Sequence, residues 1–550
     1  MKRAAFPRFT RRATGLAALA ASVVLLAADG DGQTRSSVHP YLEFQQVLTA
    51  DFNNGDVLTY TSVGGGLNAN VESRRVTATI AYDYQHRFSW NGDIQDEDVH
   101  TGLAAIHVEA VPQVLSFDAA AIATRGHADI RRPVPGLRTV DDPNQAEIYS
   151  AYAGPTLNTH AGPVTIGAAY RLGYVYVDDH SLAGGGLPPG AARVDRYKSS
   201  TVHNATASIG MAPGVLPFGW TVGAGYVREN MDRFDSKFEG QYVRGDVVVP
   251  VGPTLAFTAG AGYEKGKSSQ QDILRDSAGL PVVTADGRVL ADPTKPRLLT
   301  YDESGLIWDA GVIWRPGPRT ELQARVGHRY GGTTFTGSLE HRINESYALS
   351  AFVYDDVSSF GRLMMTDLTA VPRSFRVPRN GFGGGINGFG GGGGCVFGTK
   401  PGSGACFDDA LQSIGNFNFR NRGANVFLSG GHGAWSYGIG AGYANRRYFA
   451  PPGPDFALHG VTDQSLVLDA DLSRRLTRTS GIDFDAYAGW YDSGIRGTDN
   501  AFSSGVTGTY YRSLWRERLQ ATLSAGVYTT HAGDFDSTYG SILFGLTYSF

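Results

Sequence analysis

The chain has 550 residues and a formal net charge of −4, and it contains 73 Gly, 28 Phe and 27 Tyr but only two Cys. Without the five cations that precede residue 29 the charge would be about −9 (−4 less five). This argues against a nucleic-acid partner, which selects a concentrated basic face. Abundant Gly and aromatic residues with few charges favour an exported, β-rich protein over a cytosolic enzyme.

The first 28 residues have the features of a secretory signal peptide. Five cations, among them Arg11 and Arg12, precede the apolar run LAALAASVVLLAA at residues 16–28, and polar residues follow at once. The run is too short for a transmembrane helix, and no later segment offers about 18 consecutive apolar residues. We therefore expect residues 1–28 to be cleaved, 29–37 to form a short periplasmic segment, and 38–550 to form the fold.

Much of the remaining chain alternates with the period of a β-strand. In LIWDAGVIW, residues 306–314, every second side chain is apolar, whereas Asp309 and Gly311 lie on the opposite face. The run ELQARVGHR, residues 321–329, repeats this pattern. A uniformly apolar face opposite charges and glycines fits lipid on one side and a polar lumen on the other. No segment after residue 36 shows a convincing amphipathic helix pattern.

The connections alternate between short turns and long polar loops. The short turns, rich in Pro, Gly or Asn, lie near Pro112 and at 212–217, 250–253, 315–319, 343–346 and 430–434. The long loops cover 126–144, 178–200, 267–304, 357–422 and 446–463. Tight periplasmic turns and longer extracellular loops are typical of outer-membrane barrels. We therefore predict an all-β fold, one large antiparallel transmembrane β-barrel of about 18–22 strands in the cell outer membrane.

The end of the chain supports this prediction. In YGSILFGLTYSF, residues 539–550, the apolar residues from Ile542 to Phe550 alternate with small or polar ones. Gly545, Tyr548 and the terminal Phe550 are similar to the signal by which outer-membrane barrels are passed to their assembly machinery. Leu543 stands where a polar residue is commoner. Together with a signal peptide, this ending indicates a closing barrel strand.

The stretch AGYEKGKS, residues 261–268, matches a phosphate-binding loop only loosely. Such a loop needs a buried strand before it and a helix after it, and it begins with Gly rather than Ala261. The tetrapeptide GAGY occurs three times, at 223–226, 260–263 and 440–443, each time within an alternating run before a polar stretch. We interpret all three as strands with glycines on the lumen face, and no nucleotide cofactor is expected.

Cys395 and Cys406 lie in the glycine-rich part of the loop 357–422. A pair of cysteines in an exported protein predicts a disulfide, which by chain entropy would contribute on the order of 3 kcal/mol. The bond would hold an outer loop in place; the alternative is an ordinary flexible surface loop, and both interpretations stay open. No His is close enough in sequence to complete a metal site, and none is predicted.

Charged residues on the predicted lumen face are the functional candidates for a channel. They are Asp309, Glu321, Arg325, Arg329, Glu340 and Arg342. Charges that line a pore influence which ions pass, but mixed signs fit a self-neutralising ladder of ion pairs equally well. The chain has no GxSxG or HExxH motif, so neither a catalytic residue nor an enzymatic activity is predicted.

Two segments resemble a known family. They are WRPGPRTELQARVGHRYGGTTFTGSLEHRINESYALSAFVYDD and PYLEFQQVLTADFNNGDVLTYTSVGGGL, the latter with HRFSW and DEDVHTGL further on. They are similar to outer-membrane β-barrels associated with PEP-CTERM protein-sorting and exopolysaccharide systems. The resemblance implies a barrel with a role in envelope polysaccharide export or surface sorting, and it supplies no functional residues.

The sequence thus predicts a barrel that is a pore or an export or envelope component. Its expected partners are outer-membrane lipid, periplasmic chaperones and the barrel-assembly machinery, with polysaccharide or another envelope component as cargo or ligand. One alternative is a non-conducting surface barrel whose loops bind a partner or polysaccharide, with the lumen filled by loop 357–422. The other is a hydrolase at the barrel rim.

Overall fold

The computed structural model describes residues 35–53, 55–90, 96–127, 145–178, 197–284, 288–376, 394–411, 414–451, 458–516, 518–533 and 535–550. The predicted signal peptide and residues 29–34 lie outside this part of the chain. The first strand begins at Arg35, three residues before the predicted start of the barrel at 38. Among the described residues, no helix is long and apolar enough to cross a membrane.

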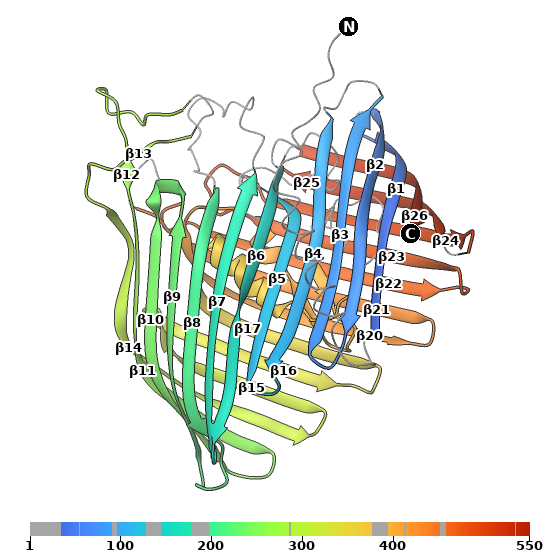
Figure 1. Ribbon diagram of the computed structural model, residues 1–550. Coiled ribbons are helices and arrows are strands. Elements are labelled where there is room, and N and C mark those ends of the chain that lie inside the picture. The colour runs from blue at the N-terminus through green and yellow to red at the C-terminus, as the bar shows by residue number, and fades with distance from the viewer. Residues whose placement is uncertain are drawn as a thin grey trace.

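One antiparallel sheet of 22 strands contains most of the chain (Figure 1). In the first half these are β1 (Arg35–Asp51), β2 (Val57–Glu72), β3 (Val76–Ser89), β4 (Glu97–Val111), β5 (Leu115–His127), β6 (Gln145–Ala161), β7 (Val164–Asp178), β8 (Ser199–Met211), β9 (Gly219–Met231), β10 (Lys237–Pro250) and β11 (Leu255–Gln270). In the second half they are β14 (Leu298–Gly317), β15 (Thr320–Arg329), β16 (Gly332–Arg342), β17 (Tyr347–Ser358), β20 (Asn418–His432), β21 (Trp435–Phe449), β22 (Thr462–Arg475), β23 (Ser480–Asp492), β24 (Ala501–Leu514), β25 (Leu519–Ala532) and β26 (Phe535–Ser549).

The sheet closes on itself. Each strand pairs with its sequence neighbours in the ring, and β1 pairs with the last strand, β26, from Tyr41 opposite Ser549 to Asp51 opposite Tyr539. A closed sheet satisfies every strand's backbone groups without an exposed edge, the condition for β structure in lipid. The predicted all-β barrel is therefore confirmed, at the upper end of the predicted strand number.

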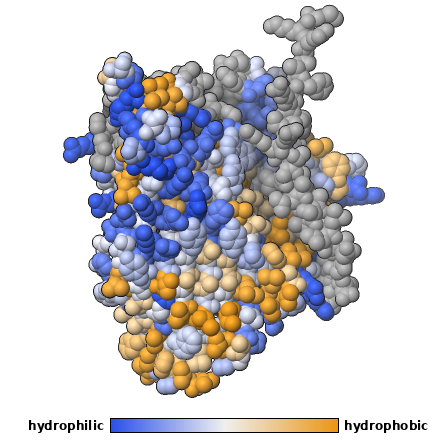
Figure 2. Space-filling model, turned by 60° about the vertical axis from the view of Figure 1, so that its left-hand side comes forward, coloured by the Kyte–Doolittle hydropathy of each residue, from blue (hydrophilic) through white to orange (hydrophobic). Residues whose placement is uncertain are grey.

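The alternation in the closing strand separates lipid from lumen. Ile542 and Phe544 are 54% and 46% exposed on the outside, while Leu543 is 1% exposed on the inside. Leu543 packs there with Val47 and Tyr60, which explains an apolar residue at a position where polar ones are commoner. In Figure 2, apolar side chains gather over the lower part of the face formed by β9 to β11, and polar ones lie above. This exterior belongs in a bilayer.

The turns and loops follow the predicted asymmetry. Short turns join the strands at one end of the barrel, for example at 73–75, 112–114 and 433–434. The connections that contain the long loops lie at the other end, and the longest joins β17 to β20. The segment AGYEKGKS lies wholly within β11, so its two lysines and its serine belong to a strand and not to a phosphate-binding turn.

Smaller elements lie in the connections. They are η2 (Arg233–Asp235), β12 (Asp272–Ile273), β13 (Ala291–Asp292), α2 (Phe360–Ala370), β18 (Cys395–Phe397), β19 (Gly404–Cys406) and α3 (Asp408–Leu411). The expectation of no helix after residue 36 was therefore wrong for α2. This helix is capped by Ser359, whose side chain accepts a hydrogen bond from the backbone N–H of Arg362, and it stops just before Pro372. Its residues Leu363 to Met365 favour helix, but the segment is too short to show a clear period.

Candidate functional site

The described parts of the connection between β17 and β20 fold into the barrel. They are residues 359–376, 394–411 and 414–417, and Figure 1 shows α2 within the ring of strands. We call these three parts together the plug. They belong to the segment that the alternative prediction placed in the lumen.

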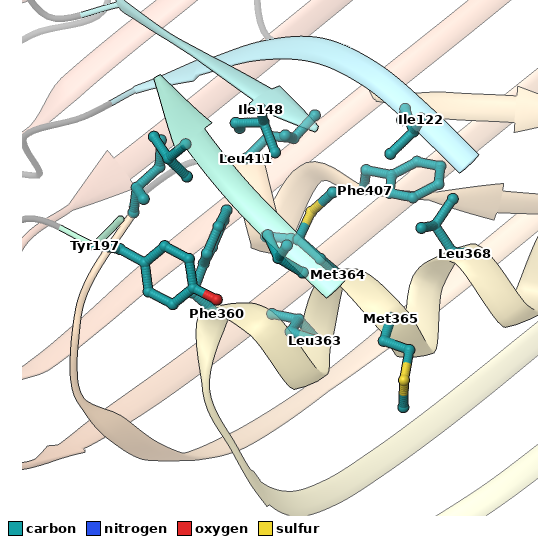
Figure 3. Close-up of a cluster of buried hydrophobic side chains, with 14 of the residues drawn as sticks. Ile122, Ile148, Tyr197, Phe360, Leu363, Met364, Met365, Leu368, Phe407 and Leu411 are labelled. Atoms are coloured by element: carbon teal, nitrogen blue, oxygen red, sulfur yellow. The ribbon is translucent and has the colours of Figure 1, made fainter. Parts of the chain in front are cut away.

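One face of the lumen wall is apolar where α2 contacts it. Phe360, Met364 and Leu368 of the helix are almost completely buried against it (Figure 3). The wall residues of this cluster come from β4 to β8: Leu103, Ala105, Ala120, Ile122, Ala146, Ile148, Tyr152, Val175, Val177 and Val202. Gly173 of β7 lies under Met365, where a Cβ atom would be 2.6 Å from the sulfur. Burial of several large apolar side chains, at about 1.5–3 kcal/mol each, attaches the helix firmly.

The same cluster continues to the opposite wall. Phe407 and Leu411 of the plug join it to Phe419, Tyr448 and Tyr491 of β20, β21 and β23. A second cluster joins Phe238 of β10 with Tyr301 of β14 and Val357 of β17. These residues lie towards the loop ends of their strands. The plug therefore spans the lumen between these walls in its extracellular half.

Arg362 is the polar centre of the plug. Its Nε donates to Oε2 of Glu229 on β9 at 3.2 Å, its Nη1 to the carbonyl of Val357 at 3.1 Å, and its Nη2 to Oδ1 of Asn418 at 2.7 Å. The guanidinium also lies over the ring of Phe238, 3.6 Å from the centroid. Burial lowers the pKa of Arg362, and the charge of Glu229 opposes this shift. One side chain thus joins the helix to β9, β10, β17 and β20.

The predicted disulfide is present between Cys395 and Cys406, and it joins β18 to β19. The hairpin packs on the inner face of β21, where Gly440 leaves room. A Cβ atom on Gly440 would be 2.6 Å from the Cys395 sulfur. Asp469 lies beside the same sulfur, at 3.3 Å. Because both cysteines are bonded to each other, this Cys–Cys–Asp group has no thiolate to offer a metal ion.

Four of the six predicted lumen charges, Asp309, Glu321, Arg325 and Arg329, form ion pairs with described residues. Asp309 and Arg325 are paired at 2.9 Å, and both belong to a group of four with Arg244 and Asp246 of β10. Arg329 pairs with Glu264 of β11. Glu321 pairs with Arg315 at 2.8 Å near a periplasmic turn, and it lies opposite Glu340 in the register, two positions from Arg342. The arrangement is largely the self-neutralising ladder.

Sequence reasoning missed Arg362 and Glu229. Arg362 lies in the predicted long loop 357–422, and Glu229 lies in the polar stretch that follows the first GAGY run, where β9 continues to Met231. Nothing in the sequence indicated that they meet, because 133 residues separate them. The polar partners Arg244, Asp246 and Glu264 were also missed, although strand parity alone puts each of them on the lumen face.

No protein-family model and no curated protein matches this chain. Among solved structures, it is similar to the FrpB iron transporter from Neisseria meningitidis, with 11% identity over 93% of this chain and 81% of that one and a TM-score of 0.44. The closed form of the ferric-catecholate import receptor Fiu from E. coli has 9% identity over 92% and 81%, with a TM-score of 0.45. BauA, the ferric preacinetobactin receptor from Acinetobacter baumannii, has 11% identity over 94% and 81%, with a TM-score of 0.43.

Similarity this distant says nothing about what the present chain carries or binds. A closed antiparallel sheet with an apolar exterior is the β form that spans a bilayer. The protein is a β-barrel of the cell outer membrane.

Proposed function

We propose that the protein is a gated passage for hydrophilic solutes across the outer membrane, closed in this state by its plug. The observation that carries the proposal is the apolar cluster that runs from β4–β8 through the plug to β20–β23. A second observation favours a passage over a solid barrel. The lumen face of β14 to β16 holds glycines and ionised side chains, of which Arg325 and Arg329 are both 28% exposed.

Conductance in planar bilayers tests the proposal. The wild-type barrel should be closed for most of the recording, and a variant in which a short Gly–Ser linker replaces residues 360–416 should conduct steadily. Heat-modifiable migration on gels would show that both variants are folded barrels. Steady conductance of the wild type at the level of the deletion variant would contradict closure by the plug.

If neither the wild type nor the deletion variant conducts, the result would instead favour the alternative of a surface barrel whose loops bind a partner. The plug itself motivates this alternative, since a permanently filled lumen leaves only the loops for function. The resemblance to barrels of exopolysaccharide and PEP-CTERM systems would make the cargo an envelope polysaccharide, and this remains a prediction. Chaperones and the assembly machinery are proposed partners during biogenesis, through the closing strand with Gly545, Tyr548 and Phe550.

A further inference from the structure

The plug contacts the barrel through two parts, the hairpin β18–β19 and the helix α2. The hairpin β18–β19 is cross-linked by its disulfide and lies on the inner face of β21. The disulfide joins the two strands of the hairpin to each other, so the hairpin and the helix α2 both contact the barrel non-covalently. At the first turn of α2 these contacts are centred on two buried charges, since the side chain of Arg362 is 6% exposed and that of Glu229 is 0% exposed. The charge pair thus belongs to the helix alone, and its loss would leave the contacts of the hairpin with β21 in place.

The two charges depend on each other. A buried charge that loses its partner is strongly unfavourable, so the pair stabilises the closed state only while both groups are in contact. The contact is also incomplete: no described residue donates a hydrogen bond to Oε1 of Glu229, which lies next to Gly361. An unsatisfied buried oxygen costs free energy that hydration would recover. The closed and open positions of the helix are thus closer in free energy than the apolar packing alone suggests.

The surroundings of Glu229 support a fixed closed position. Ser359, the N-cap of α2, donates to Oε2 of Glu229, and Asn418 donates to Ser268 of β11 at 2.8 Å. Tyr197 donates to Ser200 of β8, and both hydroxyls lie close to Gly361. Because Gly361 has no side chain, the backbone of the helix can approach β8 and β9 this closely.

We propose that the ion pair between Arg362 and Glu229 keeps the plug in its closed position, and we call this pair the latch. While the pair is intact, it holds the first turn of α2 against β8 to β10. When it is broken, this end of the helix leaves the wall and the passage opens, while the disulfide-linked hairpin stays on β21. The inference rests on the proposed function and specifies how that passage is regulated.

Single and double replacements of the pair test the latch. Arg362→Met and Glu229→Leu each leave one buried charge alone, and each should raise the open probability in planar bilayers by about tenfold or more. The double variant Arg362→Met with Glu229→Leu should return close to wild type, because an apolar pair of similar volume leaves no charge to hydrate. Thr369→Ala, an exposed position of the same helix, should leave the open probability unchanged.

A covalent lock provides an independent measurement. A Cβ atom on Gly173 of β7 would lie 3.6 Å from the Cβ atom of Met365, which is within the range that a disulfide needs, so Gly173→Cys with Met365→Cys places two cysteines within reach of each other. Oxidised, this lock should keep the Arg362→Met barrel closed, and reductant should open it. Wild-type protein with reductant shows what reduction of the native disulfide contributes.

The outcomes separate the latch from the proposed function. If the barrel without a plug conducts but both single variants stay closed, the latch is wrong and the gated passage stands. If the double variant opens as readily as the singles, lost packing and not the charge pair opens the plug, which also overturns the latch. If the barrel without a plug does not conduct, the proposed function itself fails. Gel migration of every variant identifies those that do not fold.

Discussion

The wall formed by β4 to β8 and the wall formed by β14 to β16 look alike from the membrane and differ inside. Both present apolar side chains to lipid, such as Leu172 and Phe335, which are 44% and 60% exposed. Towards the lumen, the first wall carries Ile148 and Val175, both fully buried under the plug, whereas the second carries ion pairs such as Asp309–Arg325. The lipid requires the same outer face everywhere, while the inner face depends on what it contacts.

This difference indicates where water lies in the lumen. An inner wall made of valine, isoleucine and alanine is stable only if another apolar surface covers it, and the plug provides that surface. An inner wall of glycines and paired charges needs no cover, because its polar groups are hydrated or bonded to one another. Water is therefore expected on the β14–β16 side. Substitutions in the two walls, and under the hairpin, test this difference.

A charge placed in the wall formed by β4 to β8, which the plug covers, should have the largest effect on the stability of the closed plug. Ile148→Asp introduces a carboxylate without a partner at a fully buried position, and it should destabilise the plug by about 3–5 kcal/mol. We expect persistent conductance and rapid proteolysis within the plug, with the barrel still heat-modifiable. The control is Thr336→Asp, at an exposed lumen position opposite Arg325, which should keep the plug closed. Equal proteolysis of both variants would remove the distinction between the walls.

A methyl group under the hairpin should have an intermediate effect. Gly440→Ala would place a Cβ atom 2.6 Å from the Cys395 sulfur, so the hairpin must shift, at a cost of about 1–3 kcal/mol. Gly223→Ala changes the same position of another GAGY tetrapeptide, where the nearest atom would be 3.7 Å away. Reductant should reach the disulfide faster in Gly440→Ala only, as measured by alkylation and mass spectrometry. Similar rates of disulfide reduction in both variants would show that the packing of the hairpin on β21 does not depend on this glycine.

Removal of one charge from the wall formed by β14 to β16 should change the stability of the barrel least. Asp309→Asn leaves Arg244 and Arg325 with Asp246 alone, and the partly hydrated cluster should lose roughly 1 kcal/mol or less. In the barrel without its plug, the reversal potential in a salt gradient should shift towards anions. Asp302→Asn removes the same charge from an exposed position of β14 and should produce no shift. A shift of the same size for Asp302→Asn would mean that the β14–β16 wall does not line the passage.

Most of the barrel could be predicted from local patterns. The alternation in 306–314 and 321–329 identified two neighbouring strands, and the turn at 315–319 identified their connection, because strand period and turn composition are local properties. The same reasoning separated AGYEKGKS from a phosphate-binding loop. It overlooked α2, because three turns of helix in a long loop show little period and their packing partners lie more than 150 residues away in β5 to β7.

Local sequence patterns were enough to show which chain segments cross the membrane and which side of each strand contacts lipid, since the bilayer imposes one apolar face on every strand. They also identified the cysteine pair that is bonded. The tertiary structure was needed to show that the described parts of the loop after β17 enter the lumen and that Gly440 leaves room for their disulfide. It was also needed to show that Arg362 contacts Glu229. These contacts depend on how the closed sheet brings distant strands together around one space, which no local pattern records.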